Sequence, residues 1–362
     1  VGDDASPCPR NDTFLEQVNN RYIFPELARF NVELNVDPQS LNGAVLSQFK
    51  EHLERLWQHC QQTSKDIGCN MLGIGILPTL SNDDLSLRNI SSLDRYRALN
   101  EQVLRQREGH VIELNINGED HLQVHHKDVM LEAAATSLQI HIQVDAMEAA
   151  RAFNVCKMIS AVTVGAAANS PFLFGRRLWQ ETRVPLFEQA VSVGASEYSQ
   201  RVTFGIAYAK KSILECFEAN RIWYPVILPD LIDAPAEELA HLRLHNGTIW
   251  RWNRPLIGFN AQGEPHCRIE HRVALPVLPL RRPLLRVTEL LRVQVRPLGL
   301  QFLEVDPEDV EANAAMGRKT LQQIEGFDDL WGTVKDYTAE RAAAIAGVPA
   351  ETIVAAVAQK AS

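Results

Sequence analysis

The sequence lacks the features that mark several large functional classes. Its six cysteines are scattered, and none forms the Cys-x-x-Cys pair used by zinc sites and redox motifs. We therefore expect reduced, buried thiols. The chain has no apolar run of the roughly 18 to 20 residues that a membrane span needs, and its first residues show neither a basic region nor an apolar signal core. These absences predict a cytoplasmic protein with no membrane partner.

Positive charge is also scarce, since 36 Lys and Arg residues stand against 45 Asp and Glu residues, for a net charge of -9. Such a chain has no general attraction to nucleic acid, so we expect no nucleic-acid partner. Any anionic substrate must be held by local arginines or by metal ions. The phosphate-binding patterns Gly-x-x-x-x-Gly-Lys-Ser/Thr and Gly-x-Gly-x-x-Gly are absent, which argues against P-loop, Rossmann and protein-kinase folds.

What the sequence does contain is typical of a folded globular protein: 362 residues, 46% hydrophobic and 22% charged. Three segments alternate polar and apolar residues in the manner of half-buried strands, at 30–36, 137–144 and 266–273. The other expected elements are a short strand over 71–77, a hairpin over 111–124, and helices over 41–64, 92–107 and 146–168. The pattern predicts an α+β fold with an antiparallel sheet and helices on its apolar face.

If the three alternating strands share one sheet, its open face carries an unusual set of polar side chains. The set is Asn31, Glu33, Asn35, Gln139, His141, Gln143, Arg268, Glu270 and Arg272. Any solvated sheet face is polar, so the alternation alone does not require a site. The residue types favour one, because Glu and His ligate Mg²⁺ and its nucleotide complexes, and Arg clamps carboxylate or phosphate. We interpret the face as a site for phosphoryl transfer onto a carboxylate.

Seven short motifs along the chain resemble, in order and approximate spacing, the second glutamate-cysteine ligase family, which includes bacterial carboxylate-amine ligases. The motifs lie at 33–35, 77–79, 95–96, 139–143, 168–172, 252–255 and 268–272. The resemblance covers about residues 8–276. It implies a glutamine synthetase-like and guanidino kinase-like fold, with a curved, mostly antiparallel sheet backed by helices. It also implies ATP-dependent activation of the glutamate γ-carboxylate as an acyl phosphate, followed by attack of an amine such as that of cysteine, the first step of glutathione biosynthesis.

The resemblance also implies roles for individual residues. Metal or Mg-ATP ligands would be Glu33, His141 and Glu270. The strand positions expected to contact the nucleotide are Gln139, Gln143 and Arg268. The arginines expected to hold the substrates and the transferring phosphoryl group are Arg183, Arg254 and Arg272. The residues expected nearest the substrate are Thr79, Arg95, Tyr96 and Asn169, with a turn-capping role as the alternative for Asn169.

The chain departs from the family pattern in two places. The family begins with a metal-binding Gly-x-Glu-x-Glu strand, and residues 1–25 contain no such pattern. Either that segment lies upstream of Val1 or the metal site is incomplete. The pattern also stops near 276, and residues 327–358 resemble instead a helical segment of molybdopterin oxidoreductases, without its cofactor ligands. We therefore expect a ligase domain over 1–276 and a separate C-terminal segment over 277–362.

Three hypotheses for the function remain open at this point. The first is an ATP- and Mg²⁺-dependent ligase joining glutamate to an amine. The second is a catalytically inactive relative that binds a nucleotide or an amino acid, or acts as a scaffold. The third is a zinc hydrolase built on His121, His125, His126 and His141, a run with helical metal spacing but without a matched carboxylate. The sequence is compatible with a homo-oligomer in each case.

Overall fold

The computed structural model describes residues 1–193, 200–205 and 207–274. Contacts between Cα atoms divide the chain into two units, and all the described residues except Ala161–Ala167 belong to the first. The expected C-terminal segment over 277–362, with its molybdopterin-oxidoreductase resemblance, lies outside the described residues. The boundary at 276 stays a prediction.

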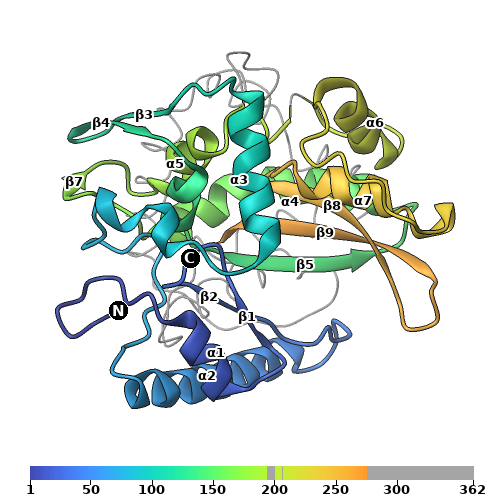
Figure 1. Ribbon diagram of the computed structural model, residues 1–362. Coiled ribbons are helices and arrows are strands. Elements are labelled where there is room, and N and C mark those ends of the chain that lie inside the picture. Colours follow the sequence, from blue (N-terminus) through green and yellow to red (C-terminus); the bar gives the residue numbers. More distant parts are fainter. Residues whose placement is uncertain (194–199, 206, 275–362) are drawn as a thin grey trace, which may run out of the picture. The chain divides into compact units, whose positions relative to one another are not determined.

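The described residues form an α+β fold in which every strand pairing is antiparallel, as expected (Figure 1). The helices are α1 (Asn11–Val18), α2 (Val45–Asp66), α3 (Asp94–Gln106), α4 (Ala149–Ala167), α5 (Arg183–Ala190), α6 (Leu214–Trp223) and α7 (Ala240–Gly247). The strands are β1 (Ile23–Pro25), β2 (Val32–Leu34), β3 (Ile112–Asn117), β4 (His121–His126), β5 (Leu138–Val144), β6 (Phe172–Leu173), β7 (Arg176–Arg177), β8 (Asn253–Phe259) and β9 (Pro265–Ala274). Short 3-10 turns include η3 (Val129–Ala134). None of the described helices has the length and apolar character needed to cross a lipid bilayer.

The central sheet has three strands in the order β5-β9-β8. Alternation along β5 turns Ile142 toward a core that also contains Ile269 of β9, Phe153 of α4 and Cys216 of α6. The helices therefore cover one face of the sheet, and the polar residues of the alternating pattern lie on the other. In Figure 1 the three strands run side by side, with α4 behind them.

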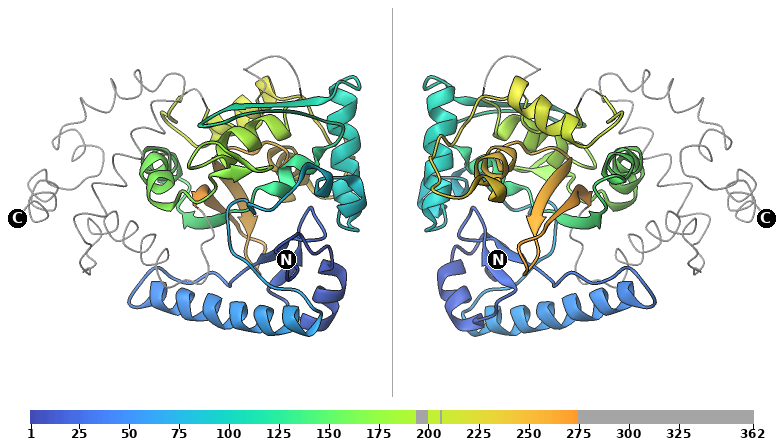
Figure 2. Two further views of the ribbon diagram at one scale, coloured as in Figure 1. Left: turned by 90° about the vertical axis from the view of Figure 1, so that its left-hand side faces the viewer. Right: turned by 90° about the vertical axis from the view of Figure 1, so that its right-hand side faces the viewer.

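A second core lies under the β3–β4 hairpin. It joins apolar residues of the hairpin to α3, η3 and α5 through side chains such as Leu114, Val103, Met130 and Leu186. A third, smaller core packs α1 against α2 and the β1–β2 hairpin through Phe14 and Cys60 (Figure 2). The amphipathic pattern over 41–64 and the hairpin pattern over 111–124 are thus confirmed as α2 and β3–β4.

The structure corrects three expectations about strands. Residues 71–77 form no strand, because the carbonyl groups of Ile74 and Gly75 accept hydrogen bonds from Thr136 instead of joining a ladder. The segment over 30–36 contributes only β2, which pairs with β1 in a separate two-stranded sheet. The third strand of the central sheet is β8, whose proline and glycine concealed it from pattern reading.

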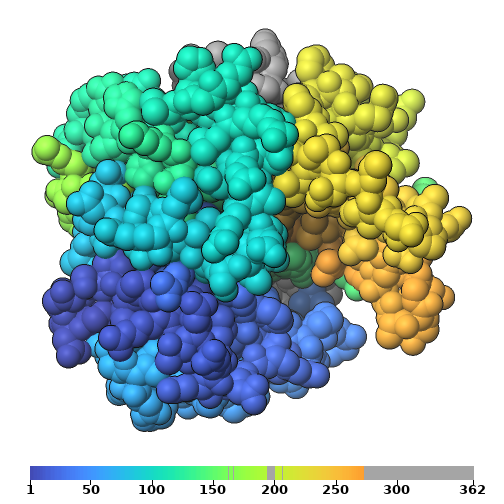
Figure 3. All heavy atoms as spheres, viewed as in Figure 1, coloured from blue at the N-terminus to red at the C-terminus, as the bar shows by residue number. Residues whose placement is uncertain are grey.

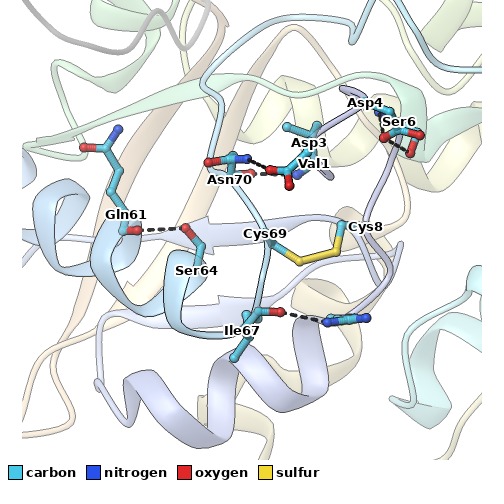
Figure 4. Close-up of a disulfide and its surroundings, with 11 residues drawn as sticks. Val1, Asp3, Asp4, Ser6, Cys8, Gln61, Ser64, Ile67, Cys69 and Asn70 are labelled. Atoms are coloured by element: carbon cyan, nitrogen blue, oxygen red, sulfur yellow. Dashed lines mark hydrogen bonds between the residues drawn. A yellow bond between two sulfur atoms is a disulfide. The ribbon is translucent and has the colours of Figure 1, made fainter.

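The expectation of reduced thiols is wrong for two cysteines. Cys8 and Cys69 form a disulfide, with an S–S distance of 2.12 Å and a Cα–Cα distance of 6.5 Å (Figure 4). The N-terminal segment is brought beside the end of α2 because Arg10 Nη1 donates to the Ile67 carbonyl at 2.7 Å. The remaining cysteines (Cys60, Cys156, Cys216 and Cys267) are free, and all but Cys267 are buried.

Candidate active site

The polar face of the central sheet carries a row of three charged or ionisable side chains, one from each strand. In the register of the sheet, Glu270 on β9 pairs with His141 on β5 and with Arg254 on β8. Arg254 Nε donates to Glu270 Oε2 at 2.6 Å and Arg254 Nη2 donates to Oε1 at 3.2 Å. His141 Nε2 lies 3.7 Å from Glu270 Oε1. Side chains directly opposite on adjacent strands are neighbours, so the strand register alone assembles this row.

The charges within this row are set by burial and by neighbouring arginines. Burial alone would raise the pKa of Glu270, but Arg272, Arg254 and His141 together hold it below the ordinary value, so Glu270 is a carboxylate at neutral pH. Burial lowers the pKa of His141 despite the opposing effect of Glu270, so the imidazole is neutral there. The row therefore offers an ionised carboxylate beside an uncharged nitrogen ligand.

Next to this row lies a second one with spare hydrogen-bond donors. Gln143 on β5 pairs with Arg268 on β9. Gly258 on β8 makes room for the neighbouring side chains, since a Cβ there would lie 2.6 Å from His266 Nε2 and 3.3 Å from Arg268 Nη2. Arg268 Nε and Arg272 Nη1 are buried and have no hydrogen-bond partner among the described residues. Buried guanidinium donors without a partner fit an anionic ligand such as a phosphate or carboxylate.

Arg272 connects the rows to a group of carboxylates that the sequence analysis missed. Arg272 interacts electrostatically with the carboxylates of Glu270, Glu132 and Glu26, which raise its pKa against the effect of burial. Its guanidinium lies 5.4 Å from the centroid of the Phe187 ring. Glu132 Oε2 is buried without a hydrogen-bond partner among these residues. Burial, reinforced by Glu26 and opposed by Arg272, raises the pKa of Glu132 to about 7. A carboxylate inside the apolar run Val-Met-Leu-Glu-Ala-Ala at 129–134 was the available signal for Glu132.

Glu33 and the α3 residues lie at this carboxylate group and not in the row on the central sheet. Glu33 raises the pKa of Glu26, although less than burial does. Arg95 Nη2 donates to the Tyr96 hydroxyl at 2.8 Å, and that hydroxyl donates to the Pro25 carbonyl at 3.3 Å. Burial raises the pKa of Tyr96 to about 12, so it stays protonated. In Figure 3 the surface is hollowed beside α3, where the strands of the central sheet are seen deeper.

Three other predicted residues are engaged elsewhere. Thr79 Oγ1 donates to the Ala5 carbonyl. Asn169 Oδ1 accepts from the Gly75 amide at 3.1 Å. Arg183 is buried, with Nε donating to Glu181 Oε1 at 2.6 Å and Nη1 donating to the Thr136 carbonyl at 2.8 Å. The structure gives these three side chains structural contacts, and their proposed substrate roles stay predictions.

The histidine run does not form the zinc site considered above. His121, His125 and His126 lie on strand β4, so helical spacing does not apply to them. His121 and His125 are exposed on one face of the hairpin, His126 is buried on the other, and His141 belongs to β5. Throughout the described part of the chain, no group of three or more His, Cys, Asp or Glu side chains is arranged to hold a metal ion.

The donor set does agree with a divalent cation that is shared with a phosphate. Mg²⁺ is commonly held by one or two carboxylates together with nucleotide phosphates, not by a protein cage. Glu270 supplies such a carboxylate, and His141 beside it adds a nitrogen ligand. The donors of Arg268 and Arg272 that have no partner among the described residues suit the phosphate. Glu33, the third expected ligand, lies in the separate β1–β2 hairpin.

Comparison with known families identifies the family of the chain. A family model described as glutamate-cysteine ligase family 2 (GCS2) matches residues 12–196, just over half of the chain. The match includes β5 and the carboxylates Glu26, Glu33 and Glu132, whereas β8 and β9 follow it in the sequence. No curated protein matches the chain. The resemblance noted from short motifs is therefore confirmed, and the chain belongs to glutamate-cysteine ligase family 2.

Proposed function

We propose that the protein is an ATP- and Mg²⁺-dependent carboxylate-amine ligase that joins the γ-carboxylate of glutamate to an amine such as that of cysteine. The observation that carries the proposal is the row Arg254–Glu270–His141, with the spare donors of Arg268 and Arg272 beside it. Family membership supports a ligase in general. The nucleotide, the cation and the two substrates are part of the proposal.

The chemistry needs an activated carboxylate and a means of balancing negative charge. Bound Mg-ATP supplies the phosphoryl group that converts the carboxylate to an acyl phosphate. Glu270 and His141 would hold the cation, and Arg268 and Arg272 would donate hydrogen bonds to phosphate oxygens. Fixed guanidinium donors are most effective where charge develops in a site that excludes water.

Arg254 acts in this proposal as a positioning residue. Its two hydrogen bonds fix both oxygens of Glu270, and its Nη1 donates to the Gly247 carbonyl at 3.1 Å, which anchors the guanidinium to the end of α7. A two-point Arg–carboxylate contact sets the orientation of the carboxylate plane. Arg254 therefore determines how Glu270 faces its ligand.

The group around α3 suits the amino-acid substrates. Glu26 and Glu33 offer negative charge for a substrate ammonium group, and the Arg95 guanidinium offers donors for a carboxylate. An amino acid carries both groups, so two opposite charges side by side match its ends. The amine acceptor would be selected in this region.

A second function has one observation in its favour. Because the described residues hold no three-ligand metal group, an inactive relative that binds a nucleotide or an amino acid is the alternative. Calorimetric titration with Mg-ATP, run beside a turnover assay, separates the two. Binding without ADP release under any amine would favour the inactive relative.

The direct test of the ligase is the release of ADP and phosphate with glutamate and a panel of amines. We expect turnover only when ATP, Mg²⁺, glutamate and an amine are all present, with product formation matching phosphate release. Omitting each component in turn provides the controls. ATP hydrolysis that is independent of every amino acid would overturn the proposal.

Glu270→Gln is the corresponding residue test. The substitution keeps the shape of the side chain but removes the charge opposite Arg254 and His141, so turnover should fall at least about 100-fold, the scale seen when one electrostatic stabiliser is lost. Glu113→Gln is the matched control, because Glu113 is an exposed strand residue that accepts a hydrogen bond from Gln123 at 2.8 Å. Near-normal turnover of Glu270→Gln would remove this carboxylate from the site.

A further inference from the structure

Three cationic side chains lie away from the proposed active site without any carboxylate partner. They are Lys157 of α4, Arg201, and Arg251 just before β8. None of them forms an ion pair with any residue that the structure describes. Arg201 and Arg251 are only 1% and 6% exposed. Charged residues are rarely buried to this extent unless they are paired.

Neutral groups hold the two arginines. Arg201 donates to the carbonyl of Thr248 at 3.1 Å and to that of Pro225, and Arg251 Nη2 donates to Asn220 Oδ1 at 2.8 Å. The Nε atom of each arginine is buried without an acceptor in the described part of the chain. Their guanidinium groups lie 5.9 Å and 5.6 Å from the centroid of the same tyrosine ring, that of Tyr224. The two arginines therefore contact the same aromatic ring, and no carboxylate in the described ranges pairs with either of them.

Lys157 is the more accessible member of the group. Its Nζ donates to the Ala207 carbonyl at 2.8 Å and lies 5.5 Å and 5.3 Å from the ring centroids of Phe153 and Tyr208. Asn154, one turn earlier on α4, fixes the same loop by two hydrogen bonds to the backbone of Ala209. The loop and the ammonium group are thus held together.

Lys157 and Arg251 converge on Gly205. A Cβ at Gly205 would lie 2.9 Å from Arg251 Nη1 and 3.9 Å from Lys157 Nζ. Gly205 has a φ of +73°, a conformation that favours glycine. Because Gly205 has no side chain, it does not cover the Lys157 ammonium group or the Arg251 guanidinium group where they approach each other.

Among the residues that the structure describes, no group neutralises the charge of Lys157 and Arg251. Burial lowers the pKa of Lys157 to about 8, and Arg251 lowers it as well. Cys216 is the only titratable neighbour that favours the charged lysine among the described residues, but burial raises the pKa of its thiol, so it stays uncharged at neutral pH. The folded protein thus bears the electrostatic cost of two adjacent cations unless an anion joins them.

The cluster lies on the helix-covered side of the central sheet. Asn253, two residues after Arg251, donates to Ser160 Oγ of α4 at 2.8 Å, whereas the next residue, Arg254, turns to Glu270. Successive strand residues point to opposite faces. The cations and the proposed active site are therefore separated by the sheet.

We propose that Lys157 and Arg251 form a binding site for a small divalent oxyanion of the phosphate or sulfate type, with Arg201 adding positive charge behind them. A tetrahedral oxyanion accepts hydrogen bonds on several oxygens and balances two cations at once. This inference does not depend on the ligase activity.

Isothermal titration of the full chain with inorganic phosphate and with sulfate, at constant ionic strength set by chloride, tests the proposal. We expect saturable binding of both oxyanions and a rise in the unfolding temperature that chloride does not produce. Lys157→Met should weaken phosphate binding at least about tenfold, the factor expected for one lost charged hydrogen bond. Lys211→Met, an exposed lysine on the same loop, is the matched control and should bind as the unmodified protein does.

A second comparison keeps the test decisive. Without oxyanion, Lys157→Met should unfold at the same temperature or higher, because it removes a partly buried charge that no carboxylate of the described residues balances. A lower unfolding temperature, both with and without phosphate, would mean that Lys157 is only structural and would overturn the proposal. Phosphate binding that survives in Lys157→Met but is lost in Arg272→Met would place the anion in the ligase site, and would overturn it equally.

Discussion

At the scale of single residues, two buried Arg–Glu pairs in the described residues have different surroundings. Arg183 and Glu181 are 4% and 0% exposed, and the Ser170 hydroxyl donates to the same carboxylate oxygen as the arginine. Glu270 is equally buried, but it lies beside His141, whose side chain is 35% exposed. The first pair is enclosed by protein on all sides. The second opens through His141 toward solvent and can meet a ligand.

Arg183→Met tests the structural reading of the enclosed pair. Removing the guanidinium leaves Glu181 as a buried carboxylate with only a hydroxyl donor, so the free energy of unfolding should fall by about 3–5 kcal/mol. Denaturant unfolding measures the change. Arg177→Met, which breaks an exposed pair with Glu119, should change it by less than about 1 kcal/mol. If Arg183→Met keeps full stability and loses only turnover, the residue contacts substrate as the family resemblance implies.

Glu132 predicts a pH dependence of stability. Its pKa is raised from 4.5 to about 7 in the folded protein, so its contribution is fully present below about pH 4.5 and is lost as the pH rises through 7. Glu132→Gln removes this titration. We expect the stability of the unmodified protein to fall relative to Glu132→Gln by on the order of 3 kcal/mol between these pH values. If the free energy of unfolding depends on pH in the same way for both proteins, the pKa of Glu132 is not raised in the folded state and this prediction is wrong.

At the scale of elements, the alternation of polar and apolar residues predicted the sheet membership of β5 and β9 correctly, but that of β2 wrongly. β5 alternates half-buried and exposed residues over its whole length, and its pairing with β9 places His141 and Glu270 on one face, as the polar pattern predicted. The strand of Glu33 shows the same alternation but is three residues long and pairs only with β1. Alternation reports which side of a strand is buried, but it contains no information on the pairing partner.

Gly118 allows the β3–β4 turn to pack closely against the backbone of Leu178. A Cβ at Gly118, in the β3–β4 turn, would lie 2.5 Å from the backbone carbon of Leu178. Gly118→Ala must therefore separate the hairpin from the segment that follows β7, at a cost of about 1–3 kcal/mol for overpacking. Gly247→Ala at the end of α7 is the control, since nothing lies within 4 Å of its Cβ position. An equally stable Gly118→Ala would mean that the two segments are free to move apart.

At the scale of the whole molecule, the disulfide constrains the unfolded chain. Cys8 and Cys69 are 61 residues apart, and closing a loop of that length is expected to contribute about 4 kcal/mol of stability. Denaturant unfolding of Cys8→Ser measures this contribution, and Cys60→Ser, which changes a buried free thiol, is the control. Thiol titration of the unfolded protein should give four groups before reduction and six after. Six groups in protein purified without reductant would show that the bond does not form.

The disulfide also bears on the compartment. Disulfides persist mainly in oxidising environments, whereas scattered cysteines and no recognisable signal led to the cytoplasm as the expectation. Sequence spacing could not reveal the pair, because the bonds from Arg10 Nη1 to the Ile67 carbonyl and from the Val1 amino group to the Asn70 carbonyl bring the two segments together only in the folded chain. The same limit applied to Glu26 and Glu132, which tertiary packing brings near enough to Arg272 for the charges to affect one another's pKa values.

The predictable part of the site was therefore its local chemistry. Residue types on β5 and β9, and the Trp-Asn-Arg-Pro motif that begins β8, were enough to name His141, Glu270 and Arg254. The direct contact of Arg254 with Glu270 required the strand order β5-β9-β8, and β8 contains Pro255 and Gly258, which strands usually avoid. Short-range patterns identified the side chains, and long-range pairing decided which of them touch.

The register of β5 and β9 has a consequence for how the protein matures. His141 precedes Glu270 in the chain by the whole stretch that contains α4, α5, α6 and α7, so the strand pair joins sequence-distant residues. Contacts of this range form slowly, because the loop between them must close before they contribute. During synthesis, β5 can pair with β9 only after residues 265–274 have emerged. A nascent chain that ends before Glu270 therefore cannot form the His141–Glu270 contact.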